Sequence, residues 1–221
     1  MNMRKVLIYG AGGQGRVVLD ILRSARTVDI LGFVDSNPAL VGRTVDGIKV
    51  LGTMADVTEI KARYPEIAAV VAIGDNYDRA HIAEQLEQFG VAFVNAVHPH
   101  TSISATACIA GNVTIAAGAI VCAHARIGQN VIVNSGAIVE HECLVEENVH
   151  LAPGTKLAGR VTVRRNTFVG IGATIIGHLV VGADAIVGAG AVVIKPVEPG
   201  TVVAGVPAKY IKPAPHASGS H

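Results

Sequence analysis

The sequence has few aromatic residues and no tryptophan, with four Phe and four Tyr among 221 residues. Because aromatic rings normally supply much of the volume of a core, this core must be filled by Val, Ile, Leu and Ala instead. The chain also lacks an excess of charge of either sign, since its formal net charge is +1. This balance gives no indication of a nucleic-acid partner or an acidic membrane surface.

Long apolar runs and paired cysteines are missing as well. No stretch reaches the roughly 18 apolar residues that a membrane-spanning helix needs. Residues 1–13 run directly into a strand and a turn rather than a signal peptide, so we expect a cytoplasmic protein. Cys108, Cys122 and Cys143 are odd in number and lack C-x-x-C spacing, which argues against a disulfide framework or a zinc ribbon. We expect them to be small buried apolar side chains.

Residues 1–98 alternate short apolar runs with amphipathic stretches, which is typical of a parallel sheet with helices. The expected strands cover residues 5–9, 30–34, 68–73 and 92–97, and the expected helices cover 14–24 and 78–89. This is about half of a full dinucleotide-binding fold. The sequence therefore predicts a small Rossmann-like domain over residues 1–98.

After His98-Pro99 an aliphatic residue recurs at every sixth position, a repeat that takes precedence over any local motif. These residues are Ile103, Ile109, Ile115, Val121, Ile127, Val133, Val139, Val145, Leu151, Leu157, Val163, Val169, Ile175, Val181, Val187 and Val193. A second small or branched residue follows four places after most of them, as in Val113, Ala119 and Ala125. Both positions are expected to face inward.

A period of six fits a short strand plus a corner, because six is a multiple of the strand period of two and not of the helical 3.6. Stacked units then align their aliphatic side chains in columns, in which an aromatic ring would overfill the space. Gly and Asn between them supply the tight corners. We therefore expect a parallel β-helix over residues 99–212, followed by a disordered tail at 213–221.

This run resembles the hexapeptide-repeat acyltransferases, over about ninety residues. The resemblance implies a left-handed β-helix with three hexapeptides per coil. The handedness comes from the resemblance alone, because the general rule for parallel crossovers would give the opposite hand.

The segment Val139–Leu144 reads VEHECL and places a histidine between two inward positions, where packing does not require it. His141 should therefore point outward, with Glu142 beside it. An imidazole whose tautomer is held by a carboxylate can accept the proton that an amine loses as it attacks a thioester. A solvated histidine among glutamates is the alternative interpretation.

The segment VEHEC, His150 nine residues after His141, Ala158-Gly159 eighteen after it, and GVPAK at Gly205–Lys209 resemble the N-acetyltransferases of nucleotide-linked 4-amino-sugars, of the bacillosamine and perosamine type. The likeness covers the whole chain. It implies acetyl transfer from acetyl-CoA, without a metal, to the 4-amino group of a UDP- or GDP-linked 4-amino-4,6-dideoxy sugar in glycan biosynthesis.

The resemblance also assigns roles to residues. It makes His141 the general base and Glu142 the residue that orients it. It makes the Gly159 amide a donor to the thioester carbonyl, where negative charge develops. It places acetyl-CoA near His150, Ile171, Ala189 and Lys209, and it implies a homotrimer with its cleft between subunits.

A glycine-rich segment, Gly10-Ala11-Gly12-Gly13-Gln14-Gly15, follows the first expected strand and precedes a helix, with Asp35 after the second strand. Such loops let backbone amides approach a pyrophosphate. The missing second half of a dinucleotide fold argues against NAD, and a nucleotide sugar needs the same cradle. The resemblance implies that the acceptor nucleotide contacts Gly12, Gly13, Gln14, Asp35 and Ser36, with Asn76 and Arg79 as further candidates.

Two features of this half leave alternatives open. Many relatives have a histidine where Gln14 stands, which leaves the recognised base or sugar undecided. For Asn76 and Arg79, a capped turn and a surface arginine are the alternative interpretation.

Features of the sequence argue against some alternative functions and leave others open. A zinc hydratase of the γ-carbonic anhydrase type needs a histidine pair five residues apart, and Glu146 stands five after His141. A nucleotidyltransferase needs a much larger N-terminal domain. An O-acetyltransferase acting on a sugar such as sialic acid would use the same chemistry at His141. A silent scaffold or nucleotide-sugar sensor would be expected to lack that base.

Overall fold

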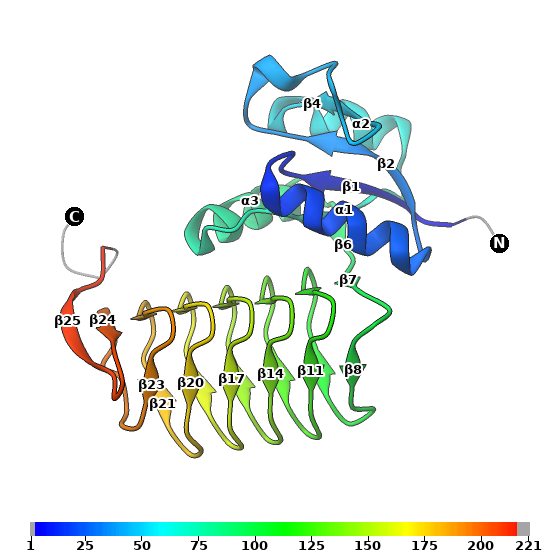
Figure 1. Cartoon of the computed structure of the whole chain (residues 1–221). Helices are drawn as coiled ribbons and strands as arrows, with labels where there is room; N and C mark the ends of the chain where they lie inside the picture. The colour runs from blue at the N-terminus through cyan, green and yellow to red at the C-terminus, as the bar shows by residue number, and fades with distance from the viewer. Residues whose placement is uncertain (1–2, 216–221) are drawn as a thin grey trace. The chain divides into compact units, whose positions relative to one another are not determined.

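The computed structural model describes residues 3–215. The chain divides into two compact units, Met1–Pro99 and His100–His221, which are described separately (Figure 1). The division lies one residue beyond the boundary expected at 98/99. Within residues 3–215, no helix is both long and apolar enough to cross a membrane.

The first unit is built on a six-stranded sheet in the order β3-β4-β2-β1-β5-β6 (Figure 1). All neighbours pair in parallel except β3 and β4. The central strands carry the core, because every residue of β5 and four of the five residues of β1 are buried. The strands of this sheet are β1 (Lys5–Tyr9), β2 (Asp29–Val34), β3 (Thr44–Val45), β4 (Ile48–Gly52), β5 (Ala68–Val71) and β6 (Ala92–Phe93), and β7 (Ala96–Val97) lies outside it. The helices are α1 (Gly13–Ala25), α2 (Val57–Arg63) and α3 (Asn76–Gln88), with short 3₁₀ turns at Pro38–Leu40 and Met54–Asp56.

The hairpin of β3 and β4 and helix α2 were absent from the sequence-based expectation. The hairpin turns at Asp46-Gly47, whose φ angles are 48° and 82°. Asp-Gly is a strong signal for a two-residue turn with both residues left-handed. The turn was therefore recoverable from the sequence, whereas β3, at two residues, is too short to show a period.

The second unit is a β-helix whose short strands pair in parallel with the strand eighteen residues later, as Thr114 does with Ile132 (Figure 1). Three strands and three corners make one coil, which confirms the predicted left-handed parallel β-helix with three hexapeptides per coil. Sheet I holds β10 (Thr114–Ile115), β13 (Ile132–Val133), β16 (His150–Leu151), β19 (Phe168–Val169), β22 (Ile186–Val187), β24 (Thr201–Ala204) and β25 (Lys209–Pro213). Sheet II holds β8 (Ser102–Ile103), β11 (Ile120–Val121), β14 (Ile138–Val139), β17 (Lys156–Leu157), β20 (Thr174–Ile175) and β23 (Val192–Val193). Sheet III holds β9 (Cys108–Ile109), β12 (Arg126–Ile127), β15 (Leu144–Val145), β18 (Thr162–Val163) and β21 (Val180–Val181).

From Asn112 to Gly190, each corner turns through one residue in the left-handed region, with φ between 56° and 72°. Corner I, between sheets I and II, uses Gly118, Gly136, Gly154, Gly172 and Gly190. Corner III, between sheets III and I, uses Asn112, Asn130, Asn148, Asn166 and Asp184. Corner II, between sheets II and III, uses His124, Glu142, Arg160 and His178. Gly, Asn and Asp adopt this conformation most readily, so corner II is the exceptional one.

The predicted inward positions are buried from Val113 to Val193, which confirms the six-residue pattern there, whereas Ile103 and Ile109 in the first coil are only half-buried. Val139, Cys143 and Val145, for example, are fully buried in one coil. The buried hydroxyls among them are satisfied, since Thr167 Oγ1 donates to the carbonyl oxygen of Gly182 at 2.7 Å. Stacked aliphatic columns therefore form the core, as the scarcity of aromatic residues predicted.

The C-terminal strand shows that the predicted start of the disordered tail was wrong. Strand β25 runs antiparallel to β24 and ends at Pro213, so the predicted tail at 213–221 begins too early. Ala214 is buried, and its N–H donates to the carbonyl oxygen of Gly200 at 2.8 Å. Backbone pairing fixes these residues where the polar, repeat-free sequence suggested disorder. The rest of the predicted tail, residues 216–221, lies outside the described residues.

Candidate active site

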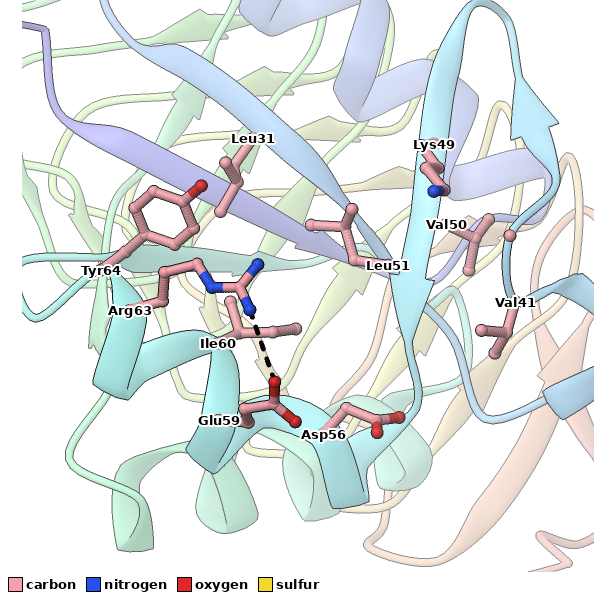
Figure 2. A pocket seen from close by; sticks show the side chains of 11 residues that line it. Leu31, Val41, Lys49, Val50, Leu51, Asp56, Glu59, Ile60, Arg63 and Tyr64 are labelled. Carbon is pink, nitrogen blue, oxygen red and sulfur yellow. Dashed lines mark ion pairs between the residues drawn. The ribbon is translucent and has the colours of Figure 1, made fainter.

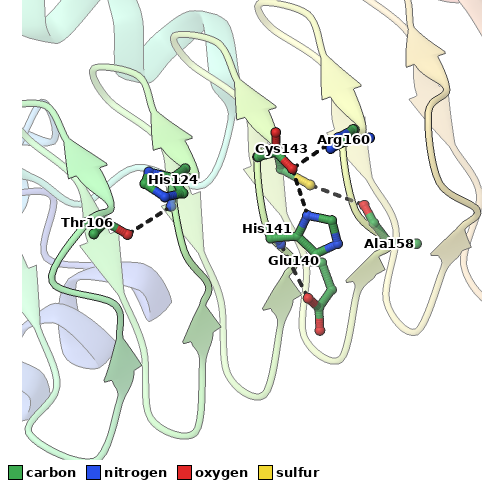
Figure 3. A network of polar contacts seen from close by, with 8 residues as sticks. Thr106, His124, Glu140, His141, Cys143, Ala158 and Arg160 are labelled. Atoms are coloured by element: carbon green, nitrogen blue, oxygen red, sulfur yellow. Dashed lines mark hydrogen bonds and ion pairs between the residues drawn. The ribbon is translucent and has the colours of Figure 1, made fainter.

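His141 stands at corner II, in the turn between β14 and β15 (Figure 3). The inward Val139 and Cys143 anchor the turn on both sides, and the left-handed Glu142, φ 58°, directs the chain around it. His141 Nδ1 lies 3.1 Å from Glu142 Oε2. Because a carboxylate can only accept, Nδ1 is the donor of this contact, and in the neutral ring Nε2 then carries the lone pair. The imidazole is about half exposed, at 53% of its side-chain surface.

Glu142 is held from a second side. Its Oε2 also accepts a hydrogen bond from Arg160 Nε at 3.0 Å, from the next coil. These bonds, that of Arg160 first and that of His141 second, hold the pKa of the Glu142 carboxyl below its usual range. The carboxylate therefore stays charged at neutral pH and can stabilise an imidazolium beside it.

Gly159 lies directly against the His141 ring. A Cβ built on Gly159 would stand 2.5 Å from His141 Nε2, so only glycine leaves room for the imidazole. The Gly159 carbonyl accepts the N–H of His178 at 3.1 Å, and within residues 3–215 its own N–H has no acceptor. The structure thus brings together the predicted base, its carboxylate and the predicted amide donor.

The cysteines near this corner are poor nucleophiles. Cys143 is fully buried, and burial raises the pKa of its thiol to about 11. Burial also raises the pKa of Cys122, and Glu140 adds to the effect. Both are thiols at neutral pH and not thiolates. The expectation that all three cysteines are buried holds for Cys143 alone. Cys122 is half-buried, and Cys108 is exposed because it occupies the outward position of β9.

The residues predicted to contact acetyl-CoA are dispersed in the single chain. His150 is buried on sheet I, where its ring meets Phe168 edge to face at 5.2 Å and its Nε2 lies 3.2 Å from Asn134 Nδ2. Ile171 and Ala189 are exposed on corner I. Because nine residues are half of a coil, His150 and His141 point to different sides of the same coil, and one chain does not join them.

Lys209 lies at the start of β25 and lines a hollow of about 460 Å³. The walls include Val193, Ile194 and Tyr210, together with Pro207 of the GVPAK segment. The Val206–Pro207 peptide bond is cis. Neither Ile171 nor Ala189 borders this hollow.

In the first unit, the glycine-rich loop forms an open cradle at the start of α1. Gly12 and Gly13 are exposed, and a Cβ on either would meet nothing within 4 Å. Gly10 and Gly15 are closely packed instead, since a Cβ on Gly15 would collide with the Gly10 carbonyl. These two glycines shape the loop, and the other two leave backbone open to a ligand.

Asp35 fixes the far side of this cradle. Its Oδ2 accepts the Ala11 N–H at 2.7 Å and its Oδ1 accepts the Asn37 N–H at 2.9 Å, while the adjacent Ser36 is exposed. Gln14 Nε2 is buried without a hydrogen-bond partner, which leaves both N–H donors of its amide group unsatisfied.

The prediction that Arg79 contacts a nucleotide was wrong. Arg79 is fully buried, and its guanidinium donates to the carbonyl oxygens of Ile73 and Gly74 at 3.0 and 3.2 Å. It also donates to Asn76 Oδ1 at 2.8 Å, so Asn76, itself buried, serves the same turn. Burial lowers the pKa of Arg79 to about 10. The capped turn is present, with the Asp75 side chain accepting the N–H groups of the helix start, and the arginine is internal rather than on the surface.

A separate hollow of about 340 Å³ lies in the first unit, between β4 and α2 (Figure 2). Apolar side chains such as Leu31, Leu51 and Ile60 line it, with an ion pair of Arg63 and Glu59 at its rim. None of the predicted nucleotide contacts lines this hollow. Among residues 3–215 there is also no cluster of three His, Cys, Asp or Glu side chains arranged to hold a metal ion.

Comparison with known proteins supports the family that the sequence resembles. Residues 5–86 match the PglD N-terminal domain. A perosamine N-acetyltransferase variant from Caulobacter crescentus, crystallised with CoA and GDP-perosamine, is 34% identical, with a TM-score of 0.89 over 94% of this chain and 96% of that one. The chain belongs to this family of hexapeptide-repeat, nucleotide-sugar N-acetyltransferases.

Two further members are similar. The acetyltransferase domain of PglB from Neisseria gonorrhoeae FA1090, in complex with acetyl coenzyme A, is 32% identical, with a TM-score of 0.88 over 96% of this chain and 100% of that one. The UDP-N-acetylbacillosamine N-acetyltransferase of Bacillus subtilis (strain 168) is 35% identical over 117 residues. That match spans about half of the curated relative, 52% of its length and 52% of this chain. The predicted family, and with it the class of acetyl-CoA-dependent transferases, is confirmed.

Proposed function

We propose that this protein transfers an acetyl group from acetyl-CoA to the 4-amino group of a UDP- or GDP-linked 4-amino-4,6-dideoxy sugar. The observation that carries the proposal is the grouping of His141, Glu142 and Gly159 at corner II. The solved relatives support the substrates, since one was crystallised with CoA and GDP-perosamine and another with acetyl coenzyme A.

The chemistry is a direct attack. The amine nitrogen forms a bond to the thioester carbonyl carbon, and the C–S bond breaks to release the coenzyme A thiolate. Nε2 of the half-exposed His141 ring, whose Nδ1 is held by Glu142, takes the proton that the amine loses. The resulting imidazolium returns that proton to the thiolate, and Glu142 stabilises the charge meanwhile. The Gly159 N–H, without an acceptor in the described chain, is available to the developing oxyanion.

The acceptor nucleotide is assigned to the glycine-rich cradle of the first unit. Gly12 and Gly13 present backbone N–H groups at the start of α1, where the helix dipole favours a pyrophosphate. Asp35 and Ser36 stand across the loop, and Gln14 offers an unsatisfied donor. The 4-amino position and the identity of the nucleotide base are parts of the proposal that the assay below decides.

A second copy of the chain completes the site in this proposal. His150 and the corner I residues Ile171 and Ala189 lie away from corner II in one chain. A closed symmetric trimer can place these surfaces of one copy against corner II of the next. We therefore propose a homotrimer whose coenzyme A cleft lies between subunits.

The test is coenzyme A release, followed with a thiol reagent, from acetyl-CoA and a panel of UDP- and GDP-4-amino-4,6-dideoxy sugars. Turnover is expected with one amino-sugar. Loss of the base in His141→Ala is expected to lower kcat by roughly 10²- to 10⁴-fold. Turnover only with a hydroxylated acceptor such as sialic acid would make the protein an O-acetyltransferase, and no release with any acceptor would refute the proposed function.

A further inference from the structure

The left-handed positions of the β-helix are occupied by residues that favour this conformation, Gly, Asn, Asp or His, at all but two places. Every such residue on corners I and III is Gly, Asn or Asp, and two on corner II are His. Glu142 and Arg160 are the exceptions, with φ of 58° and 62°. Long side chains adopt this conformation at a steric cost, and such strained residues cluster at functional sites.

The two exceptions are paired with each other. They stand eighteen residues apart on neighbouring coils, and Arg160 Nε donates to Glu142 Oε2 at 3.0 Å (Figure 3). His141 Nδ1 reaches the same oxygen at 3.1 Å. One carboxylate oxygen thus serves the predicted base and the arginine together.

Stability does not account for this arrangement. The Arg160 and Glu142 side chains are 54% and 45% exposed, and ion pairs so open to solvent contribute little to folding. A glycine or an asparagine at either position would relieve the backbone. The side chains are therefore retained for what they do beside His141.

From this geometry, and on the basis of the proposed function, we propose that Arg160 is a positioning residue that forms a His141–Glu142–Arg160 array. It fixes the Glu142 carboxylate against Nδ1 and offsets part of its negative charge. Without that offset, Glu142 would stabilise the imidazolium more strongly. More of His141 would then already be protonated before the amine attacks, and the ring would return its proton to the coenzyme A thiolate less readily.

The remaining titratable groups around His141 are the same in wild type and in an Arg160 variant. Glu140 Oε2 accepts the His141 N–H at 3.3 Å. Cys122 and His124 precede it on the neighbouring coil, Cys143 lies inward on the same turn, and His178 follows on the coil after Arg160. A comparison of variants at position 160 therefore isolates the arginine charge.

The experiment compares wild type with Arg160→Gln, Arg160→Lys and Arg164→Gln in the coenzyme A release assay from about pH 5.5 to 9. Arg164→Gln is the matched control, because Arg164 pairs with Glu146 across the same eighteen-residue spacing on another corner. In Arg160→Gln the acid limb of the kcat/KM profile is expected to move up by about half to one pH unit. Its kcat is expected to fall about 3- to 10-fold at pH 7, which is about 0.7–1.4 kcal/mol.

Arg160→Lys keeps the charge, so its acid limb is expected to return towards that of wild type, with an intermediate kcat. Arg164→Gln is expected to match wild type. A profile of Arg160→Gln that superimposes on wild type, or a lysine variant that behaves like the glutamine variant, would overturn the role of Arg160. A change in melting temperature without a change in the pH profile would also overturn it. An inactive wild type would instead refute the proposed function.

Discussion

At the scale of single residues, the site depends on an absence, the missing side chain of Gly159. The His141 ring occupies the space that a Cβ would take. At Arg79 a large charged side chain is required instead. It is buried, and its guanidinium donates hydrogen bonds to carbonyl oxygens of the turn between β5 and α3. In both cases the residue type is explained by its immediate neighbours.

Gly159→Ala is predicted to displace the imidazole, because the new methyl group would stand 2.5 Å from Nε2. We expect kcat to fall at least about 10-fold, the equivalent of 1.4 kcal/mol in the transition state. The control is Gly111→Ala, since a Cβ there meets nothing within 4 Å. Steady-state kinetics on the active amino-sugar measure both, and equal activities would show that the ring position tolerates the methyl group.

At the scale of elements, corner III carries a ladder of side-chain hydrogen bonds along the β-helix. Asn112, Asn130, Asn148 and Asn166 each donate through Nδ2 to the next residue in the column, which ends at Asp184, over 2.8–3.0 Å. Each rung satisfies a left-handed residue and ties two coils together. Such a ladder makes corner III structural, in contrast to corner II.

Asn148→Ala is predicted to destabilise the β-helix by about 2–3 kcal/mol. It removes two rungs at about 1 kcal/mol each and leaves a Cβ in the left-handed region without the hydrogen bonds that offset its strain in asparagine. Asn148→Gly loses the same rungs without that strain and should cost less. The free energy of unfolding from denaturant titration ranks the three proteins. A glycine variant less stable than the alanine variant would contradict the account.

At the scale of the whole molecule, the proposed site requires more than one copy. The residues expected to meet acetyl-CoA point away from corner II in a single chain, and the β-helix is too regular to bend them together. In the proposed trimer, assembly places these surfaces near His141.

The molecule is accordingly predicted to have a mass of about 68 kDa in solution, three times the 22.7 kDa of one chain. Light scattering after size exclusion measures this directly. A monomeric mass at assay concentrations, with full activity, would contradict the shared cleft.

The periodic half of the molecule could be predicted closely from sequence. A six-residue aliphatic repeat permits one stacking of short strands, and it placed His141 outward because the flanking Val139 and Cys143 had to be inside. Strands β1, β2 and β5 of the first unit were also found, since they are short apolar runs, whereas the hairpin of β3 and β4 was not. The family likeness, not the repeat, supplied the handedness.

What depends on contacts distant in sequence could not be predicted in this way. The sequence by itself determined the β-helix, the outward turn at His141 and the glycine cradle, because local periodicity and backbone freedom decide these features. Only the tertiary structure decided that Arg79 is internal, that His150 faces away from His141, and that Arg160 shares Glu142 with the base. These features depend on how the coils stack and how the turns close. Stacking brings into contact residues that are a whole coil apart in the sequence, and a pattern read along the sequence does not show such contacts.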